Sequence, residues 1–168
     1  MNTVLFSRVL TVAAVLDLYL AASIFPAEAA AVNCNGGTTK AVFNTIADAN
    51  FSTSSTTFEL IPGASISVPL SGAVSDTYTL TFSGQASATG GGSWDVEAVR
   101  SIDGGAFGLM PPVRIITFHS GNKPDANSMT WCNRISAGTS IDFRILWRKT
   151  GGGTAAIGGY TMQVIRSE

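Results

Sequence analysis

The segment from 137 to 149 carries the longest alternation of apolar and polar residues in the chain. Its apolar members occupy every second position: Ile141, Phe143, Ile145 and Trp147. Because successive side chains of a β-strand point to opposite faces, a period of two predicts a strand with one buried face. Glycine-containing turns at Gly138 and at residues 151–153 mark its two ends.

Shorter alternations recur along the chain and predict about eight or nine strands in all. The clearest cover residues 58–61, 66–70, 76–88, 94–99, 113–118, 129–135 and 160–165. Residues 40–46 fit either a first strand or a short helix, and residues 50–57 are expected to form a loop. Pro69 has no backbone N–H to donate, so its strand is expected at a sheet edge. Because segment 113–118 is apolar on both sides, we expect both sides to be covered.

The fold class follows from this order of elements. No amphipathic helix is predicted after the first 30 residues, which excludes parallel βαβ architecture. We therefore predict an all-β fold, a two-sheet antiparallel sandwich of the jelly-roll type. Charged residues make up 12% of the chain, too few for a helical bundle or a coiled coil.

The first 29 residues predict a secretory signal peptide. Arg8 precedes an apolar run, and Ala27-Glu28-Ala29 has small residues where a signal peptidase cleaves. A retained membrane anchor is the alternative, but the apolar run is short for a span and Asp17 would be costly in a bilayer. We expect cleavage after Ala29, no membrane span in the processed protein, and a secreted, periplasmic or cell-surface location.

The processed chain is expected to contain a tail or first strand, residues 30–55, followed by the jelly-roll domain, residues 56–168. It holds both cysteines, Cys34 and Cys132. Export implies an oxidising compartment, so we predict one disulfide that ties the tail to a core strand. Two unpaired thiols are the alternative.

The charge of the chain argues against one class of partner. The full chain has a net charge of −1, and removing Arg8, Asp17 and Glu28 leaves equal numbers of acidic and basic residues. There is no basic run, so nucleic acid is not an expected partner. No cofactor is implied.

Four stretches carry a family resemblance: residues 76–87, 101–105, 135–139 and 160–166. They read DTYTLTFSGQAS, SIDGG, ISAGT and YTMQVIR. Together they resemble the C1q/TNF-like jelly roll, especially its small bacterial and viral members, over residues 71–165. The resemblance implies a strand order and carries no catalytic residue. It also implies a homo-oligomer, in that family commonly a trimer, that acts as a binding or structural module.

Two acidic pairs are candidates for chemistry. Asp95 and Glu97 lie two residues apart on one strand and so share a face, as a two-carboxylate hydrolase acting on carbohydrate would require. Asp103 and Asp125 could serve a cation-dependent lectin. A solvated sheet face is the simpler interpretation of the first pair, because charged residues are normally exposed.

Other conspicuous residues are given structural interpretations. His119, the only histidine, begins a polar loop and is expected at the surface. The three tryptophans are on the apolar phase of their strands, which favours core packing over a sugar-stacking platform: Trp94, Trp131 and Trp147. Asn50-Phe51-Ser52 matches the N-glycosylation pattern, which matters only in a eukaryotic secretory pathway.

Five apolar residues occupy the phase opposite the predicted core: Val99, Ile116, Phe118, Leu146 and Ile165. Apolar area on an outer sheet face often marks an association surface, so we expect these residues to pack between subunits of a homo-oligomer. The sequence thus predicts a secreted, non-enzymatic module. It would act by self-association or by binding a ligand such as a polysaccharide or a surface protein.

Overall fold

The computed structural model describes residue 34 and residues 37–70, 75–113 and 115–168. All of these belong to one compact unit, residues 31–168. The predicted signal peptide lies outside the described residues. Within the described part of the chain the regular structure is entirely β, and no helix there is long and apolar enough to cross a membrane.

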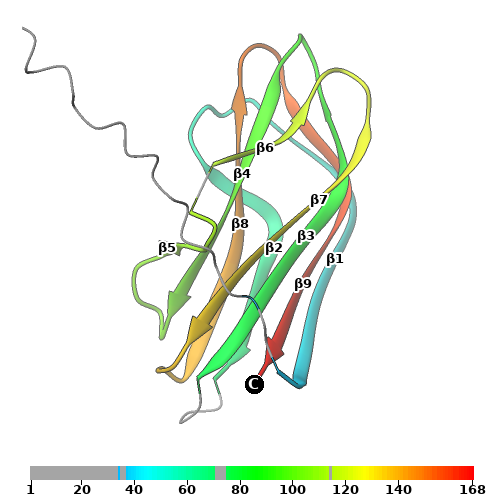
Figure 1. Cartoon of the computed structure of the whole chain (residues 1–168). Helices are drawn as coiled ribbons and strands as arrows, with labels where there is room; N and C mark the ends of the chain where they lie inside the picture. Colours follow the sequence, from blue (N-terminus) through cyan, green and yellow to red (C-terminus); the bar gives the residue numbers. More distant parts are fainter. Residues whose placement is uncertain (1–33, 35–36, 71–74, 114) are drawn as a thin grey trace, which may run out of the picture. The chain divides into compact units, whose positions relative to one another are not determined.

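Nine strands form two sheets (Figure 1). Their bounds are β1 Thr39–Thr53, β2 Glu59–Pro69, β3 Asp76–Ala88, β4 Ser93–Ile102, β5 Gly108–Leu109, β6 Ile116–Ser120, β7 Asp125–Ile135, β8 Ser140–Thr150 and β9 Ala155–Ser167. The first sheet has the order β1-β9-β3-β7, and the second has the order β2-β8-β4-β5, with β6 also paired to β4. Every pairing is antiparallel.

The connections between strands identify the topology. The chain passes from one sheet to the other at every connection except those from β4 to β5 and from β5 to β6. This alternation of the chain between a four-stranded and a five-stranded sheet is the arrangement of a jelly roll. The all-β, two-sheet antiparallel sandwich predicted from the sequence is therefore confirmed.

The core lies between the sheets and is rich in aromatic side chains. The alternation in β8 is confirmed, because its apolar members are at most 1% exposed: Ile141, Phe143, Ile145 and Trp147. All three tryptophans are equally buried, so they pack in the core. Trp94 meets Trp147 edge to face, with ring centroids 5.4 Å apart, and contacts Phe118 at 4.8 Å. Such aromatic pairs stabilise a core beyond the area they bury.

Two strands have other bounds than the sequence predicted. Residues 58–61 and 66–70 form most of one strand, β2, whose bulge includes Gly63 at φ +79°. The expected edge position of Pro69 is confirmed, since β2 is the first strand of its sheet. β1 is a strand and not a helix, and it continues to Thr53 through part of the predicted loop.

The prediction that segment 113–118 is covered on both sides was wrong. Val113 and Ile115 are 60% and 53% exposed, and the strand itself begins only at Ile116. Val113 and Ile115 lie between β5 and β6, and neither has a partner in the strand pairings of the described residues.

The predicted disulfide is confirmed between Cys34 and Cys132, which are 98 residues apart in sequence and 5.8 Å apart between Cα atoms. Cys132 lies in β7 and is 1% exposed. The bond therefore ties the segment before β1 to the opposite edge of the same sheet, because β1 and β7 are its two outermost strands.

Candidate functional site

The outer face of the β1-β9-β3-β7 sheet is lined by hydroxyl and amide groups. Thr81 on β3 and Thr130 on β7 are opposite each other, with their hydroxyls 3.2 Å apart. In the same sheet, Gln163 on β9 donates from Nε2 to Oδ1 of Asn44 on β1 at 3.0 Å. These bonds hold side chains of neighbouring strands in register without any net charge.

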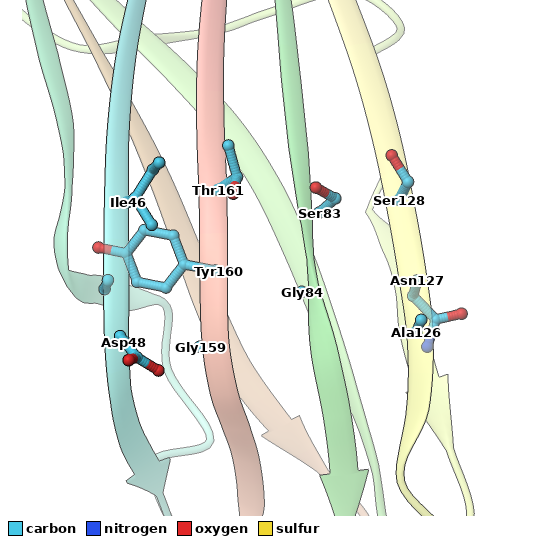
Figure 2. Close-up of a pocket in the computed structure, with 11 residues that line it drawn as sticks. Ile46, Asp48, Ser83, Gly84, Ala126, Asn127, Ser128, Gly159, Tyr160 and Thr161 are labelled. Atoms are coloured by element: carbon cyan, nitrogen blue, oxygen red, sulfur yellow. The ribbon is translucent and has the colours of Figure 1, made fainter.

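A groove of about 630 Å³ lies on this face (Figure 2). Four of its residues form a row across the four strands, because Ile46 is opposite Thr161, Thr161 opposite Ser83, and Ser83 opposite Ser128. Its full lining is Ile46, Ala47, Asp48, Ser83, Gly84, Ala126, Asn127, Ser128, Gly159, Tyr160 and Thr161. The groove thus combines groups that are remote in sequence.

Glycines and bulges shape the floor of the groove. The register of β1 against β9 shifts between Ala47 and Asn50, and that of β3 against β9 shifts after Gly84. Gly159 has φ +78°, a left-handed conformation that residues with a Cβ rarely adopt. A Cβ on Gly84 would lie 2.8 Å from the carbonyl oxygen of Gly159, so only glycine allows the two strands to approach so closely here.

A second, smaller cavity of about 260 Å³ follows the groove along the strands. Its lining includes Asn50 and Gln85, each two residues beyond a groove residue on its strand, and Gly158 next to Gly159. Two residues of a strand span about 7 Å. The two hollows are therefore neighbours on one face of the sheet, and amide groups line the smaller one.

The chemistry of the groove is polar and carries no cationic side chain among its lining residues. Asp48 is the one carboxylate that lines it. Tyr160 is 4% exposed, and its hydroxyl donates to the carbonyl oxygen of Pro62 at 2.7 Å. Burial raises the pKa of Tyr160. Its ring packs 5.3 Å from that of Phe82, so Tyr160 forms part of the wall and is not a free acid or base.

The carboxylates that the sequence singled out lie on the other sheet. Asp95 and Glu97 do share the outer face of β4, but neither lines the groove. Asp95 is 5% exposed and forms an ion pair with Arg148 at 3.2 Å, while Thr117 donates its hydroxyl at 3.1 Å. Burial raises the pKa of Glu97, and the charge of Arg148 partly opposes this effect.

The acidic residues considered for a cation site are also separate. Oδ1 of Asp103 accepts hydrogen bonds from the backbone N–H of Thr139 at 2.7 Å and of Ser140 at 2.9 Å. Asp125 stands at the exposed start of β7. Among the residues with described positions, no three histidine, cysteine or acidic side chains converge in a way that could hold a metal ion.

His119 was expected at the surface, and this prediction was wrong. The ring is 4% exposed, and its Nε2 lies 2.8 Å from the carbonyl oxygen of Gly121. The cause is a bulge in β6, where Trp94 pairs with His119 but Asp95 pairs with Thr117. The extra residue turns His119 toward the protein.

The five residues proposed as one oligomer face do not share a face, so that prediction was wrong. Phe118 is 4% exposed in the core, and Ile116 packs against the core from the same strand. Ile165 lies on the first sheet, opposite Val42. Only Val99 and Leu146 are together, on the outer side of the second sheet, and Val99 is itself 5% exposed.

Sequence reasoning missed the groove residues. Threonines alternate with apolar residues over 77–81, which indicates a water-facing side of the strand but no hollow. The signal that could have located the hollow is the pair Gly158-Gly159 within the terminal strand, because glycines in a strand often mark a bulge or a close approach of backbones.

Comparison with known proteins leaves the family of this chain open. No family model matches it, and no curated protein matches it. Among solved structures, a chain of the infectious bursal disease virus Gx strain is similar with a TM-score of 0.46 and 17% identity, covering 78% of this chain and 32% of the viral one. Dimeric latent PorU from Porphyromonas gingivalis is similar with a TM-score of 0.38 and 12% identity, covering 79% of this chain and 14% of PorU. At these TM-scores neither likeness carries an argument about function.

Proposed function

We propose that this protein is an exported, non-enzymatic β-sandwich module that binds an uncharged carbohydrate chain in the groove of the β1-β9-β3-β7 sheet. The observation that carries the proposal is the groove itself, which offers hydroxyl, amide and carboxylate groups from four strands and no cation. Export is supported by the N-terminal sequence pattern and by the disulfide, because such bonds persist in oxidising compartments.

The lining groups fit the chemistry of a sugar. Ser83, Ser128 and Thr161 can both donate and accept hydrogen bonds, as sugar hydroxyls require. Asp48 would accept from a pair of hydroxyls and would repel an anionic ligand. The Ile46 side chain, 72% exposed at the rim, offers an apolar contact to the C–H face of a ring. The second hollow beyond Gly159 suits a ligand longer than one sugar unit.

A glycan array followed by calorimetry with the best neutral glycan tests this proposal. Thr161→Val and Ser128→Ala each remove one hydroxyl with little change of shape. We expect each to weaken binding about threefold to tenfold, the value of one hydrogen bond. Asp48→Asn should weaken it at least as much. Thr79→Val on the same face, which lies outside the groove, is the matched control and should leave affinity unchanged.

Two outcomes would argue against the groove. One is that the parent binds no neutral glycan at millimolar concentration. The other is that binding is unaffected by all three groove variants. If the parent cleaves the glycan and Asp95→Asn stops the cleavage, the hydrolase interpretation of Asp95 and Glu97 is supported instead.

A further inference from the structure

Part of the outer face of the β2-β8-β4-β5 sheet is apolar. We call the apolar face the surface formed by Leu60, Val99, Phe107, Leu109, Ile115 and Leu146. Four of its members are between 39% and 53% exposed: Leu60, Phe107, Leu109 and Ile115. Contiguous apolar surface of this kind on a soluble domain commonly marks a site of protein association.

One carboxylate within this surface, Glu97, forms no ion pair among the described residues. Glu97 on β4 is opposite Leu146 on β8, and Leu146 is opposite Leu60 on β2. Within the described part of the chain the Glu97 side chain accepts no hydrogen bond. Burial raises its pKa, and the charge of Arg148, which is itself paired with Asp95, only partly opposes this effect. A half-buried carboxylate among leucines is costly unless a cation or a donor reaches it.

Arg144, which lies in the neighbouring row of outward-facing residues, also forms no ion pair among the described residues. Arg144 on β8 is opposite Val99 on β4, which in turn is opposite Leu109 on β5. Its guanidinium lies 4.2 Å from the ring centroid of Phe107, while its Nε is buried without a hydrogen-bond partner. By contrast, Arg148 two positions further along β8 from Leu146 is already paired with Asp95.

We propose that the apolar face binds a second copy of this chain in a twofold-symmetric dimer, in which Glu97 of each copy pairs with Arg144 of the other. A twofold axis brings residue i against residue j and j against i, so a face that holds one unpaired anion and one unpaired cation side by side complements itself. Glu97 and Arg144 occupy adjacent rows on adjacent strands, as such an axis between them requires.

The size of the face sets the expected strength. Four strands and six residues along β8 make a patch of about 14 Å by 20 Å. That is about 280 Å² per copy, well below the roughly 800 Å² per partner of a standard interface, so we expect weak, reversible association with a dissociation constant of about 100 μM to millimolar order. The dimer would leave the opposite sheet, and with it the carbohydrate groove, free in both copies; the dimer does not depend on that groove.

Sedimentation equilibrium over a micromolar to millimolar concentration range tests the proposal with a charge-reversal pair. Glu97→Arg places two like charges against Arg144 of the other copy, and Arg144→Glu does the same with two carboxylates. Each variant alone should be monomeric. Mixed in equal amounts they should form a heterodimer, because each unfavourable pair then becomes a favourable one. Circular dichroism of each variant confirms that it is folded.

The milder variant Glu97→Gln should raise the dissociation constant about tenfold or more, because it removes two charge pairs per dimer. Val42→Thr reduces an exposed apolar group on the opposite sheet and is the matched control, which should dimerise like the parent. A parent that is monomeric throughout the range would overturn the proposal. So would single variants that dimerise as the parent does, or a mixture that remains monomeric.

Discussion

The two outer faces of this sandwich differ much more than its two inner faces do. Inside, both sheets present closely packed apolar and aromatic side chains that are almost fully buried. Outside, the β1-β9-β3-β7 sheet shows hydroxyls and amides that bond to one another across strands, whereas the β2-β8-β4-β5 sheet has a patch of leucines and a phenylalanine beside Glu97 and Arg144, which form no ion pair among the described residues. Folding requires apolar side chains on the inner faces, but it places little constraint on the residues of the outer faces.

This difference teaches where to look for function in a chain without a catalytic signature. Exposing a hydroxyl-rich face to water costs no free energy. Its hollow at the Gly159 bulge is open to a polar ligand. An apolar face with an unpaired Glu97 is costly in water, and its cost falls when another surface covers it. The first face therefore suits a sugar and the second suits a protein.

The two proposals reinforce each other if both hold. A dimer through the apolar face would carry two grooves on its opposite sides. Two linked sites bind a multivalent surface more tightly than one, because the second contact is intramolecular. Variants that keep the groove but lose the dimer should then bind an isolated oligosaccharide normally and a polymer more weakly.

The largest expected effect is on the free energy of unfolding, and it does not involve either outer face. Cys34→Ser removes the disulfide and leaves an exposed hydroxyl, since Cys34 is the exposed partner. Chain-entropy models assign about 4–5 kcal/mol to a closure of this length. Urea unfolding should show a loss of up to that size, and reductant should produce the same loss in the parent. The dimer mass should not change, because Cys132 lies in the other sheet. Unfolding curves that coincide for variant and parent would contradict this account.

The second effect distinguishes two kinds of arginine on one strand. Arg148→Met leaves the 8%-exposed carboxylate of Asp95 without its cation, so we expect a loss of about 1–3 kcal/mol in the free energy of unfolding. Arg144→Met should change the unfolding of the dilute monomer by about 0.5 kcal/mol or less, because its guanidinium has no ionic partner among the residues that the structure describes. It should instead abolish dimerisation. Equal destabilisation by the two variants would remove the distinction.

The inner faces could be predicted from sequence because burial follows a period of two. In β8 the apolar phase is the core, with Phe143 and Trp147 on the same side. In β6 both phases are apolar, so alternation alone did not reveal that Phe118 points inward, and a bulge next to it also buried His119. A bulge shifts the alternation of inward and outward side chains by one residue, and no pattern in the sequence predicts the bulge in β6.

The groove could not be predicted because it depends on the register of four strands. Ile46, Ser83, Ser128 and Thr161 are ordinary outward residues in sequence and become neighbours only through three separate pairings. The apolar face was predicted in part, through Val99 and Leu146. Its exposed members Phe107 and Leu109 lie in and beside the two-residue strand β5, which is too short to show a period.

The smallest expected effect is on the pH dependence of stability. It distinguishes Asp103, which accepts hydrogen bonds, from Glu97, which accepts none among the described residues. Hydrogen bonds from Thr139, its backbone N–H first, and from Ser140 lower the pKa of Asp103, so the folded state favours the ionised form. Its contribution to stability is complete above the unfolded pKa of about 3.9 and is lost as pH falls through the lower folded value. The raised pKa of Glu97 has the opposite sign, so its contribution is complete below about pH 4.3 and is lost as pH rises through the folded value.

Melting temperatures of dilute, monomeric protein across this pH range separate the two carboxylates. Asp103→Asn is the suitable variant, because Asp103 has φ +51° and asparagine tolerates that conformation. It should melt below the parent at neutral pH, and the gap should close in acid. Glu97→Gln should match the parent in acid and melt above it at neutral pH, since the amide is less costly to bury than the carboxylate. If Glu97→Gln instead lowered the neutral melting temperature of the monomer, Glu97 would have a partner within its own chain and would not be available to a second copy.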